Sequence, residues 1–287
     1  MTQRRSCDQP PNWWALLCQT DSVGEIVEVR DANDPRLADF RDLTLADRRP
    51  DRPGGRGLVI AEGVTVVRRL LDSPYRPRAL FGVPAKIAQL AADVAGAPCY
   101  TGSAELMAEV VGFHLNRGVL ATADRAPVPS VPELIARAQH VAVLEGINDH
   151  ENLGALFRNA AALGVDAVML GPGCADPLYR RSVRVSMGHV LRVPFALLRS
   201  WPDDLEALRV AGFRIAALTP VVKAVPLMQA GVATGRVAWL LGAEGSGLSS
   251  VALGAADLAV RIPMAPGVDS LNVATAAAIA FAGARRI

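Results

Sequence analysis

The sequence contains few cysteines, and they form no pattern that builds a metal site. The four residues, Cys7, Cys18, Cys99 and Cys174, are widely spaced, and no two form a Cys-x-x-Cys pair. Structural zinc sites and disulfide frameworks both depend on closely patterned cysteines. The sequence therefore suggests neither, no metal is expected, and a reducing cytoplasm is the compartment that fits this usage.

Long hydrophobic runs are also missing. No apolar run reaches the roughly 18 residues of a membrane-spanning helix, so no membrane association is expected. Residues 13–18 are apolar, but the run is short for a secretory signal and follows two prolines. We interpret residues 1–24 as a poorly ordered extension.

Lysine is nearly absent, and the formal net charge is only +2. A charge this small means that the field of the whole protein is not the main driver of binding. Lys86 and Lys223 are the only lysines among 30 basic residues. The abundant arginine reflects either genome composition or selection for phosphate recognition, because guanidinium groups match phosphate geometry.

The composition is that of a folded protein with two domains. Apolar residues make up 51% of the 287 positions and charged residues 20%, which suffices for sizeable cores. Three prolines in residues 126–132 indicate a linker. We therefore predict a small α/β domain at 25–125, a linker at 126–137 and a second domain at 138–287. The first contains expected strands at 57–61, 78–83 and 118–122, with helices from residue 64 and at 87–95.

The second domain shows a more regular alternation of strands and helices. Such alternation predicts βαβ units and hence a parallel sheet. Helices are expected at 153–163, where Gly164 ends the helix, at 202–211 and at 270–286, whose last turn carries Arg285 and Arg286. The expected strands are residues 140–144, 166–170, 191–197, 213–218, 236–241 and 258–262.

Three segments in the second domain place polar or glycine-rich loops after apolar strands, where α/β sheets bind ligands. The first is residues 152–158. Asn152 stands where a helix N-cap belongs, and Arg158 lies off the apolar stripe, where a guanidinium can reach a phosphate or a developing oxyanion. An ordinary cap followed by a solvated arginine is the alternative.

The second segment, residues 241–248, contains three glycines and Glu244. A Walker loop requires lysine and then serine or threonine after Gly247, whereas Leu248 and Ser249 follow it here, which disfavours a nucleotide-dependent switch. The glycine spacing also fails the dinucleotide fingerprint. Because a glutamate buried among glycines is costly without a partner, the segment is either a ligand loop or a tight turn.

The third segment comprises residues 262–264 and 270–273. Ser270 is the candidate N-cap of the last helix. Asn272 would then lie in the first helical turn, beside free N–H groups that attract anions. A capped helix with no ligand is the alternative.

Together the three segments resemble the SpoU-type branch of the SPOUT superfamily, which comprises S-adenosylmethionine-dependent RNA ribose 2′-O-methyltransferases. The resemblance covers residues 138–287, with His150 in place of the usual proline and Ala274 in place of the usual serine. The residues that match the three family motifs are Asn152, Gly154 and Arg158; Gly242, Glu244, Gly245 and Gly247; and Ile262, Pro263, Met264, Ser270, Leu271, Asn272 and Val273.

The resemblance implies a parallel-sheet domain with a deep trefoil knot, a homodimer formed through that domain, and ribosomal RNA as the expected substrate. Catalysis is assigned to Arg158, either as a base or, because a guanidinium is a poor base, as a stabiliser of the alkoxide. Asn152, Glu244, Ser270 and Asn272 would position substrate and arginine. The expected cofactor-binding residues are Gly242, Ala243, Gly247, Ile262, Met264 and Leu271.

The first domain resembles the L30e-like substrate-binding domain of ribosomal RNA members through residues 61–63 and 114–119. His114, Asn116 and Arg117 are either RNA contacts or a solvated loop. Arg180, Arg181 and Arg184 contact RNA or a partner subunit, or form a solvated helix face. Transfer RNA as the substrate, methylation of a base nitrogen, and an RNA-binding module with a vestigial cofactor loop are the alternatives; the Arg158 motif argues against base methylation.

Overall fold

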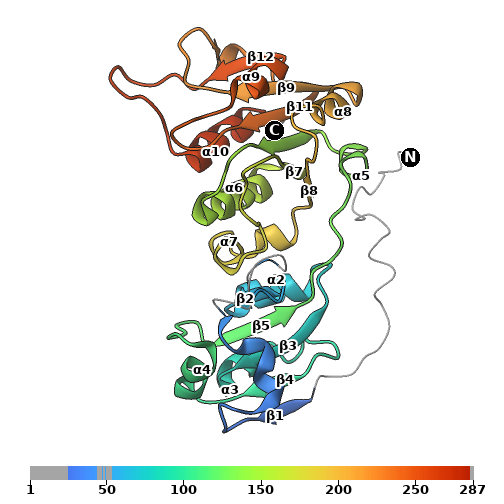
Figure 1. Ribbon diagram of the computed structural model, residues 1–287, viewed down its shortest axis with the longest axis vertical. Coiled ribbons are helices and arrows are strands. Elements are labelled where there is room, and N and C mark those ends of the chain that lie inside the picture. Colours follow the sequence, from blue (N-terminus) through green and yellow to red (C-terminus); the bar gives the residue numbers. More distant parts are fainter. Residues whose placement is uncertain (1–24, 44–46, 48, 50–53, 285–287) are drawn as a thin grey trace, which may run out of the picture.

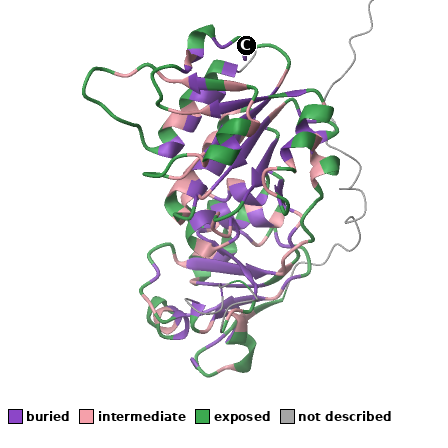
Figure 2. Cartoon of the chain, turned by 45° about the horizontal axis from the view of Figure 1, so that its top comes forward, coloured by how far each residue is buried: buried purple, intermediate pink, exposed green. Residues whose placement is uncertain are grey.

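The computed structural model describes residues 25–43, 47, 49 and 54–284, which form two α/β parts with one sheet each (Figure 1). The predicted extension at 1–24, and Arg285 and Arg286, lie outside the described residues. Both sheets are buried inside shells of more exposed helices and loops (Figure 2). The chain therefore has the mixed α/β architecture that its strand and helix alternation predicts.

The first part contains a five-stranded sheet in the order β1-β4-β3-β5-β2. Strands β1, β4 and β3 are parallel, whereas β5 is antiparallel to both β3 and β2. Helices α2 (Val64–Leu71) and α3 (Pro84–Ala88) pack on one face, and α4 (Ala104–Val111) packs on the other. The strands are β1 (Ile26–Glu28), β2 (Val59–Glu62), β3 (Pro77–Gly82), β4 (Cys99–Thr101) and β5 (Val119–Ala123).

The three strands predicted here are confirmed to within two residues, but the predicted helix at 87–95 is wrong. Helix α3 ends at Ala88 and gives way to turns. Arg68 of α2 explains part of this ending, because its guanidinium donates to the Gln89 carbonyl (2.7 Å) and to Asp93 (2.8 Å). Strands β1 and β4 were not predicted, because three residues are too few for a periodic signal.

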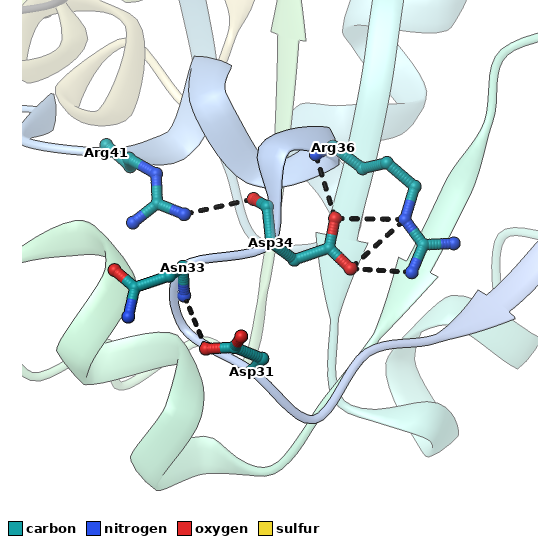
Figure 3. Close-up of polar contacts among 5 residues, drawn as sticks. All are labelled: Asp31, Asn33, Asp34, Arg36 and Arg41. Carbon is teal, nitrogen blue, oxygen red and sulfur yellow. Dashed lines mark hydrogen bonds and ion pairs between the residues drawn. The ribbon is translucent and has the colours of Figure 1, made fainter.

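A short 3-10 helix, η2 (Pro35–Phe40), covers the α4 face of this sheet and is held by its own capping residue (Figure 3). The Asp34 carboxylate accepts the Arg36 backbone N–H (2.9 Å) and pairs with the Arg36 guanidinium (2.6 Å). These contacts lower the pKa of Asp34 to about 2. Arg41 donates to the Asp34 carbonyl (3.0 Å). The cap thereby orients η2 so that its buried face packs into the core.

The second part is a seven-stranded, fully parallel sheet in the order β10-β12-β9-β11-β6-β7-β8. Helices α6, α7 and α10 cover one face, and α5, α8 and α9 cover the other. The strands are β6 (His140–Leu144), β7 (Ala167–Leu170), β8 (Phe195–Leu197), β9 (Phe213–Leu218), β10 (Val225–Pro226), β11 (Arg236–Leu241) and β12 (Leu258–Arg261). The helices are α5 (Val131–Ile135), α6 (His150–Leu163), α7 (Arg180–Val185), α8 (Leu205–Val210), α9 (Ser250–Ala255) and α10 (Val273–Ala284).

The predictions for this part are mostly confirmed. Strands β6, β9 and β11 begin and end at the predicted residues, and α6 ends at Gly164 in the left-handed conformation, with φ of 74°. The predicted strand at 191–197 is wrong in its first half. Residues 189–191 form a 3-10 turn, and Pro194, which has no N–H for a ladder, precedes the short β8. The predicted linker at 126–137 contains α5, which begins with a capping box of Ser130 and Glu133.

The two parts meet where α7 packs against β2 and the 3-10 turn at His189–Leu191 packs against α2 (Figure 1). Arg180 at the start of α7 points into the first part. Its guanidinium lies 3.5 Å from both Asp47 and Glu62 and 4.4 Å from the centre of the Phe113 ring. Asp47 is fully buried and Glu62 is 5% exposed. Buried charges need partners, so this cluster couples the positions of the two sheets.

We predict that Asp47→Asn removes a pH dependence of stability. Burial raises the pKa of Asp47 to about 6, against the attraction of Arg180. The folded protein then binds a proton more tightly than the unfolded chain, so this carboxyl contributes stability below about pH 4 that is lost as the pH rises through about 6. The unfolding free energy of the wild type relative to Asp47→Asn should fall by up to about 3 kcal/mol across that window.

Urea unfolding of both proteins at pH 4 and pH 7 measures this difference. Asp72→Asn, at an exposed carboxyl after α2, is the control and should match the wild type at both values. If the unfolding free energy of the wild type relative to Asp47→Asn rose with pH instead, the raised pKa assigned to Asp47 would be contradicted.

Candidate active site

Helix α6 begins three residues before the predicted position. Asp149, and not Asn152, is its N-cap: the Asp149 carboxylate accepts the N–H groups of Glu151 (3.0 Å) and Asn152 (2.8 Å). His150, where the resemblance leads us to expect proline, is the first helical position, and its ring packs at a tilt of 42° against Tyr179 with ring centres 4.4 Å apart. Because Asp149 caps the helix, the Asn152 side chain is available for another contact.

That contact is Asn272. Its side-chain amide donates to the Asn152 side-chain oxygen (2.8 Å) and to Glu244 Oε1 (2.7 Å). The Asn272 oxygen in turn accepts the backbone N–H groups of Ala274 (3.0 Å) and Thr275 (3.2 Å). Asn272 is therefore the N-cap of α10, and the prediction that Ser270 is the cap is wrong. One amide group thus joins all three predicted motifs.

The glycine loop after β11 is a tight turn. Ala243 and Gly247 form an antiparallel bridge, with the Gly247 N–H donating to the Ala243 carbonyl (3.0 Å). Glu244 lies at the turn and is exposed, so the expectation of a buried glutamate is wrong, although its expected partner exists in Asn272. A Cβ on Gly242 would lie 2.3 Å from the backbone of Gly247 and Leu248. Only glycine permits this close approach.

Arg158 and Ser270 lie outside the hydrogen-bonded cluster. Arg158 is exposed on α6, where its charge contributes, after burial and two other arginines, to lowering the pKa of His189. Arg158 lies six positions after Asn152 on the helix, which places the two side chains about 120° apart around its axis. Glu244 therefore pairs with Asn272 and not with Arg158. Ser270 is exposed in the loop that leads to α10.

The predicted cofactor residues lie after β11 and β12, at the carboxyl edge of the sheet, and in the loop before α10. Ile262 and Met264 are half-buried, and Leu271 is 36% exposed. Gly242 and Ala243 are also partly accessible. Accessible apolar side chains beside main-chain donors and acceptors suit an adenine ring. The residues present therefore fit S-adenosylmethionine.

Comparison with known proteins decides the family. The SpoU rRNA Methylase family model matches residues 139–282, half of the chain. The chain belongs to this family. An uncharacterized tRNA/rRNA methyltransferase of Mycobacterium tuberculosis is 59% identical over 261 residues, covering 90% of this chain and 91% of the relative. A 23S rRNA (guanosine(2553)-2′-O)-methyltransferase of Bacillus subtilis is 30% identical, covering 64% of this chain and 71% of that protein.

Solved structures agree with the family assignment. The AdoMet-bound rRNA methyltransferase from Sinorhizobium meliloti has a TM-score of 0.77 and 25% identity, covering 91% of this chain and 98% of that chain. This SpoU-family protein is therefore an RNA methyltransferase, and the predictions of the family and of S-adenosylmethionine as the cofactor are confirmed.

The predicted RNA contacts of the SpoU protein lie in two places. His114, Asn116 and Arg117 are exposed in the turn between α4 and β5. The arginines of α7 have different surroundings. Arg180 faces the first part, as described above, whereas Arg181 forms an ion pair with Glu151 (2.5 Å). Arg184 is exposed. The structure thus gives Arg180 a role between the two parts that the sequence did not indicate.

Sequence reasoning missed two residues that hold the site together. Asn159 donates its side-chain N–H to the Ala274 carbonyl (2.8 Å) and ties α6 to α10. Glu145, directly after β6, is buried and accepts hydrogen bonds from Trp201 and Ser249. The one available signal for Glu145 was an acidic residue immediately after an apolar strand.

Within residues 25–43, 47, 49 and 54–284, no cluster of three histidine, cysteine or acidic side chains forms a metal site. The same residues include no helix long and apolar enough to cross a bilayer.

We predict that Gly242→Ala disrupts the glycine loop. The added methyl group would overlap the backbone of Gly247 and Leu248, and such overpacking costs roughly 1–3 kcal/mol. The loop would have to move, so binding of S-adenosylmethionine measured by isothermal titration calorimetry should be lost. Gly254→Ala is the matched control, because a Cβ there meets nothing within 4 Å and alanine favours helix α9. Equal cofactor affinity in both variants would contradict the steric argument.

Proposed function

We propose that this SpoU-family protein transfers a methyl group from S-adenosylmethionine to a ribose 2′-hydroxyl of ribosomal RNA. The observation that carries the proposal is the Asn152–Asn272–Glu244 cluster, which joins three sequence motifs at the carboxyl edge of the parallel sheet. The 23S rRNA 2′-O-methyltransferase of Bacillus subtilis, to which this chain is similar, supports 2′-O chemistry on ribosomal RNA. Transfer RNA is the second candidate substrate, because the Mycobacterium tuberculosis relative is named for both.

When bound, S-adenosylmethionine supplies a methyl group activated on a sulfonium centre. The ribose oxygen would take this methyl group and release S-adenosylhomocysteine, and the hydroxyl proton would pass to the adjacent phosphate or to water. The protein must therefore orient the hydroxyl and stabilise negative charge on its oxygen. Backbone groups of Gly242, Ile262 and Leu271 would hold the adenosine, in a site completed by Ala243, Gly247 and Met264.

Arg158 would bind the phosphate beside the target ribose and stabilise the developing alkoxide. A guanidinium keeps its proton at neutral pH, so electrostatic stabilisation suits it better than proton removal. The exposure of Arg158 supports this role, because RNA can reach it. Asn152, Asn272 and Glu244 would position the two reactants through their shared hydrogen bonds. Ser270 would contact the substrate from the loop that leads to α10.

The proposal extends to the chain path and to RNA binding. We infer the family's trefoil knot, for which the support is that α10 returns to α6 and is tied there through Asn159. We also infer that residues 25–125 form an L30e-like RNA-binding domain. The exposed candidates for RNA contact are His114, Asn116, Arg117, Arg181 and Arg184.

We predict that Arg158→Ala lowers methyl transfer by roughly 100-fold or more, which is the usual loss when a transition-state charge contact is removed. Incorporation of labelled methyl groups into ribosomal RNA from cells that lack the protein measures transfer, and mapping of 2′-O-methylated nucleotides identifies the site. Binding of S-adenosylmethionine should stay within about twofold, because the contact forms only with substrate.

Arg137→Ala is the matched control, since Arg137 is also exposed but precedes β6, at the opposite edge of the sheet. Full activity in Arg158→Ala, or a methyl group found on a base, would overturn the proposal.

We also predict a homodimer formed through the second part. Large apolar side chains are exposed on α10 and near it, including Ile279 (39%), Met228 (87%) and Leu271 (36%). Exposed apolar groups that gather in one region favour association. Light scattering after size exclusion should give twice the 30.3 kDa chain mass for the wild type and one chain mass for Ile279→Glu. A monomeric wild type at micromolar concentration would contradict the prediction.

A further inference from the structure

Glu145 is a buried glutamate that no motif of the sequence assigns to the site. It follows β6 directly, is 9% exposed, and precedes Gly146, which lines a small cavity with Asn152 and Glu244. Taking a carboxylate out of water is costly unless several donors satisfy it. The identity of those donors therefore indicates what the residue does.

Three donors surround the carboxylate. Glu145 Oε1 accepts the indole N–H of Trp201 (2.7 Å) and the hydroxyl of Ser249 (2.7 Å). Glu145 Oε2 accepts the backbone N–H of Ser249 (2.8 Å). Two of the three bonds therefore go to one residue, Ser249, which is also the N-cap of α9. Short bonds to a buried carboxylate are strong ones, so Ser249 is firmly located.

The main chain of Glu145 holds the other end of the same loop. Its N–H donates to the carbonyl of Leu241, the last residue of β11 (2.9 Å). Leu241 and Ser249 are the residues on either side of the glycine loop 242–248, which carries Glu244. Glu145 thus fixes where the loop leaves the sheet and where it enters α9. Between these anchors, Gly245 and Gly247 have φ values of 85° and 67°, a conformation that favours glycine.

We propose that Glu145 is a positioning residue of the cofactor loop: its carboxylate holds Ser249 so that loop 242–248 keeps the conformation that binds S-adenosylmethionine. The inference rests on the proposed function, since it assumes that this loop contacts the cofactor. Glu145 itself lies beneath the loop, and its carboxylate oxygens are hydrogen-bonded to Trp201 and Ser249. Its contribution is to preorganise the loop, which lowers the conformational cost of binding.

Glu145→Gln tests this role. The amide oxygen can keep the two bonds made at the Oε1 position, to Trp201 and to the Ser249 hydroxyl, and the N–H₂ group then faces the Ser249 backbone N–H, so the bond that holds the loop end is lost. Titration calorimetry of the full-length protein with S-adenosylmethionine, without RNA, should show a dissociation constant raised about tenfold, the effect of one net buried hydrogen bond. Hydrogen exchange of the backbone amides of residues 243–249 should become faster in the variant.

Three further variants, of which Trp201→Phe and Ser103→Ala are controls, separate loop positioning from general stability. Trp201→Phe removes the donor that lies outside the loop, and it should lower the melting temperature while leaving the dissociation constant within about twofold. Ser249→Ala removes a loop donor and a helix cap together, so it should weaken cofactor binding. Ser103→Ala removes the corresponding cap of α4, where the serine hydroxyl accepts the Leu106 N–H (3.1 Å), and it should leave cofactor binding unchanged.

The outcomes distinguish this inference from the proposed function. If the wild type binds S-adenosylmethionine and Glu145→Gln binds it equally well, the positioning role is overturned and the proposed function stands. An equal loss of cofactor affinity in Trp201→Phe or Ser103→Ala would also overturn it, because the loss would then result from lower overall stability and not from release of the loop. If the wild type gives no heat with millimolar S-adenosylmethionine, the proposed function fails and this inference fails with it. Should Glu145→Gln fail to fold, Ser249→Ala compared with Ser103→Ala decides the question.

Discussion

The double use of the Asn272 side chain is the interaction on which the candidate site depends. Its oxygen caps α10 while its nitrogen donates to both Asn152 and Glu244. An amide can do this because it presents two donors and an acceptor on one planar group, whereas an aspartate could cap the helix but would repel Glu244. The start of α10, the first turn of α6 and the glycine loop after β11 are thereby set relative to one another by a single side chain.

The parallel sheet makes this arrangement possible. All seven strands point the same way, so the loops that follow β6, β11 and β12 leave from one edge, although more than 100 residues separate the first from the last. Two further ties hold that edge. Asn159, on α6, binds the backbone of α10. Glu145 lies beneath the glycine loop and binds the residues at both of its ends. The site therefore has a rigid support, which catalysis by orientation requires.

The contact between the two parts depends on a buried cluster of charged side chains. Arg180, Asp47 and Glu62 form a charged cluster that is almost closed to water. Among the residues that the structure describes, the buried side-chain atoms Asp47 Oδ1 and Thr122 Oγ1 have no hydrogen-bond partner. A buried ion cluster gains little over an apolar contact, but it tolerates few alternative geometries. In this protein it determines how the first part is placed beside α6 and α7, the helices that carry Arg158 and the exposed arginines.

The sequence by itself determined the elements whose signals are local. Apolar strands of five or six residues that are followed by glycine or a charged residue were predicted at the correct residues, as with β6 and β11, and the three motifs were sufficient for the family. The tertiary structure alone decided which polar side chains meet. Asn152 and Ser270 were expected to cap helices because each precedes an apolar run, yet Asp149 and Asn272 do so. Capping competes with contacts across more than 100 residues, and neither those contacts nor the buried Glu145 leave a periodic signal in the chain.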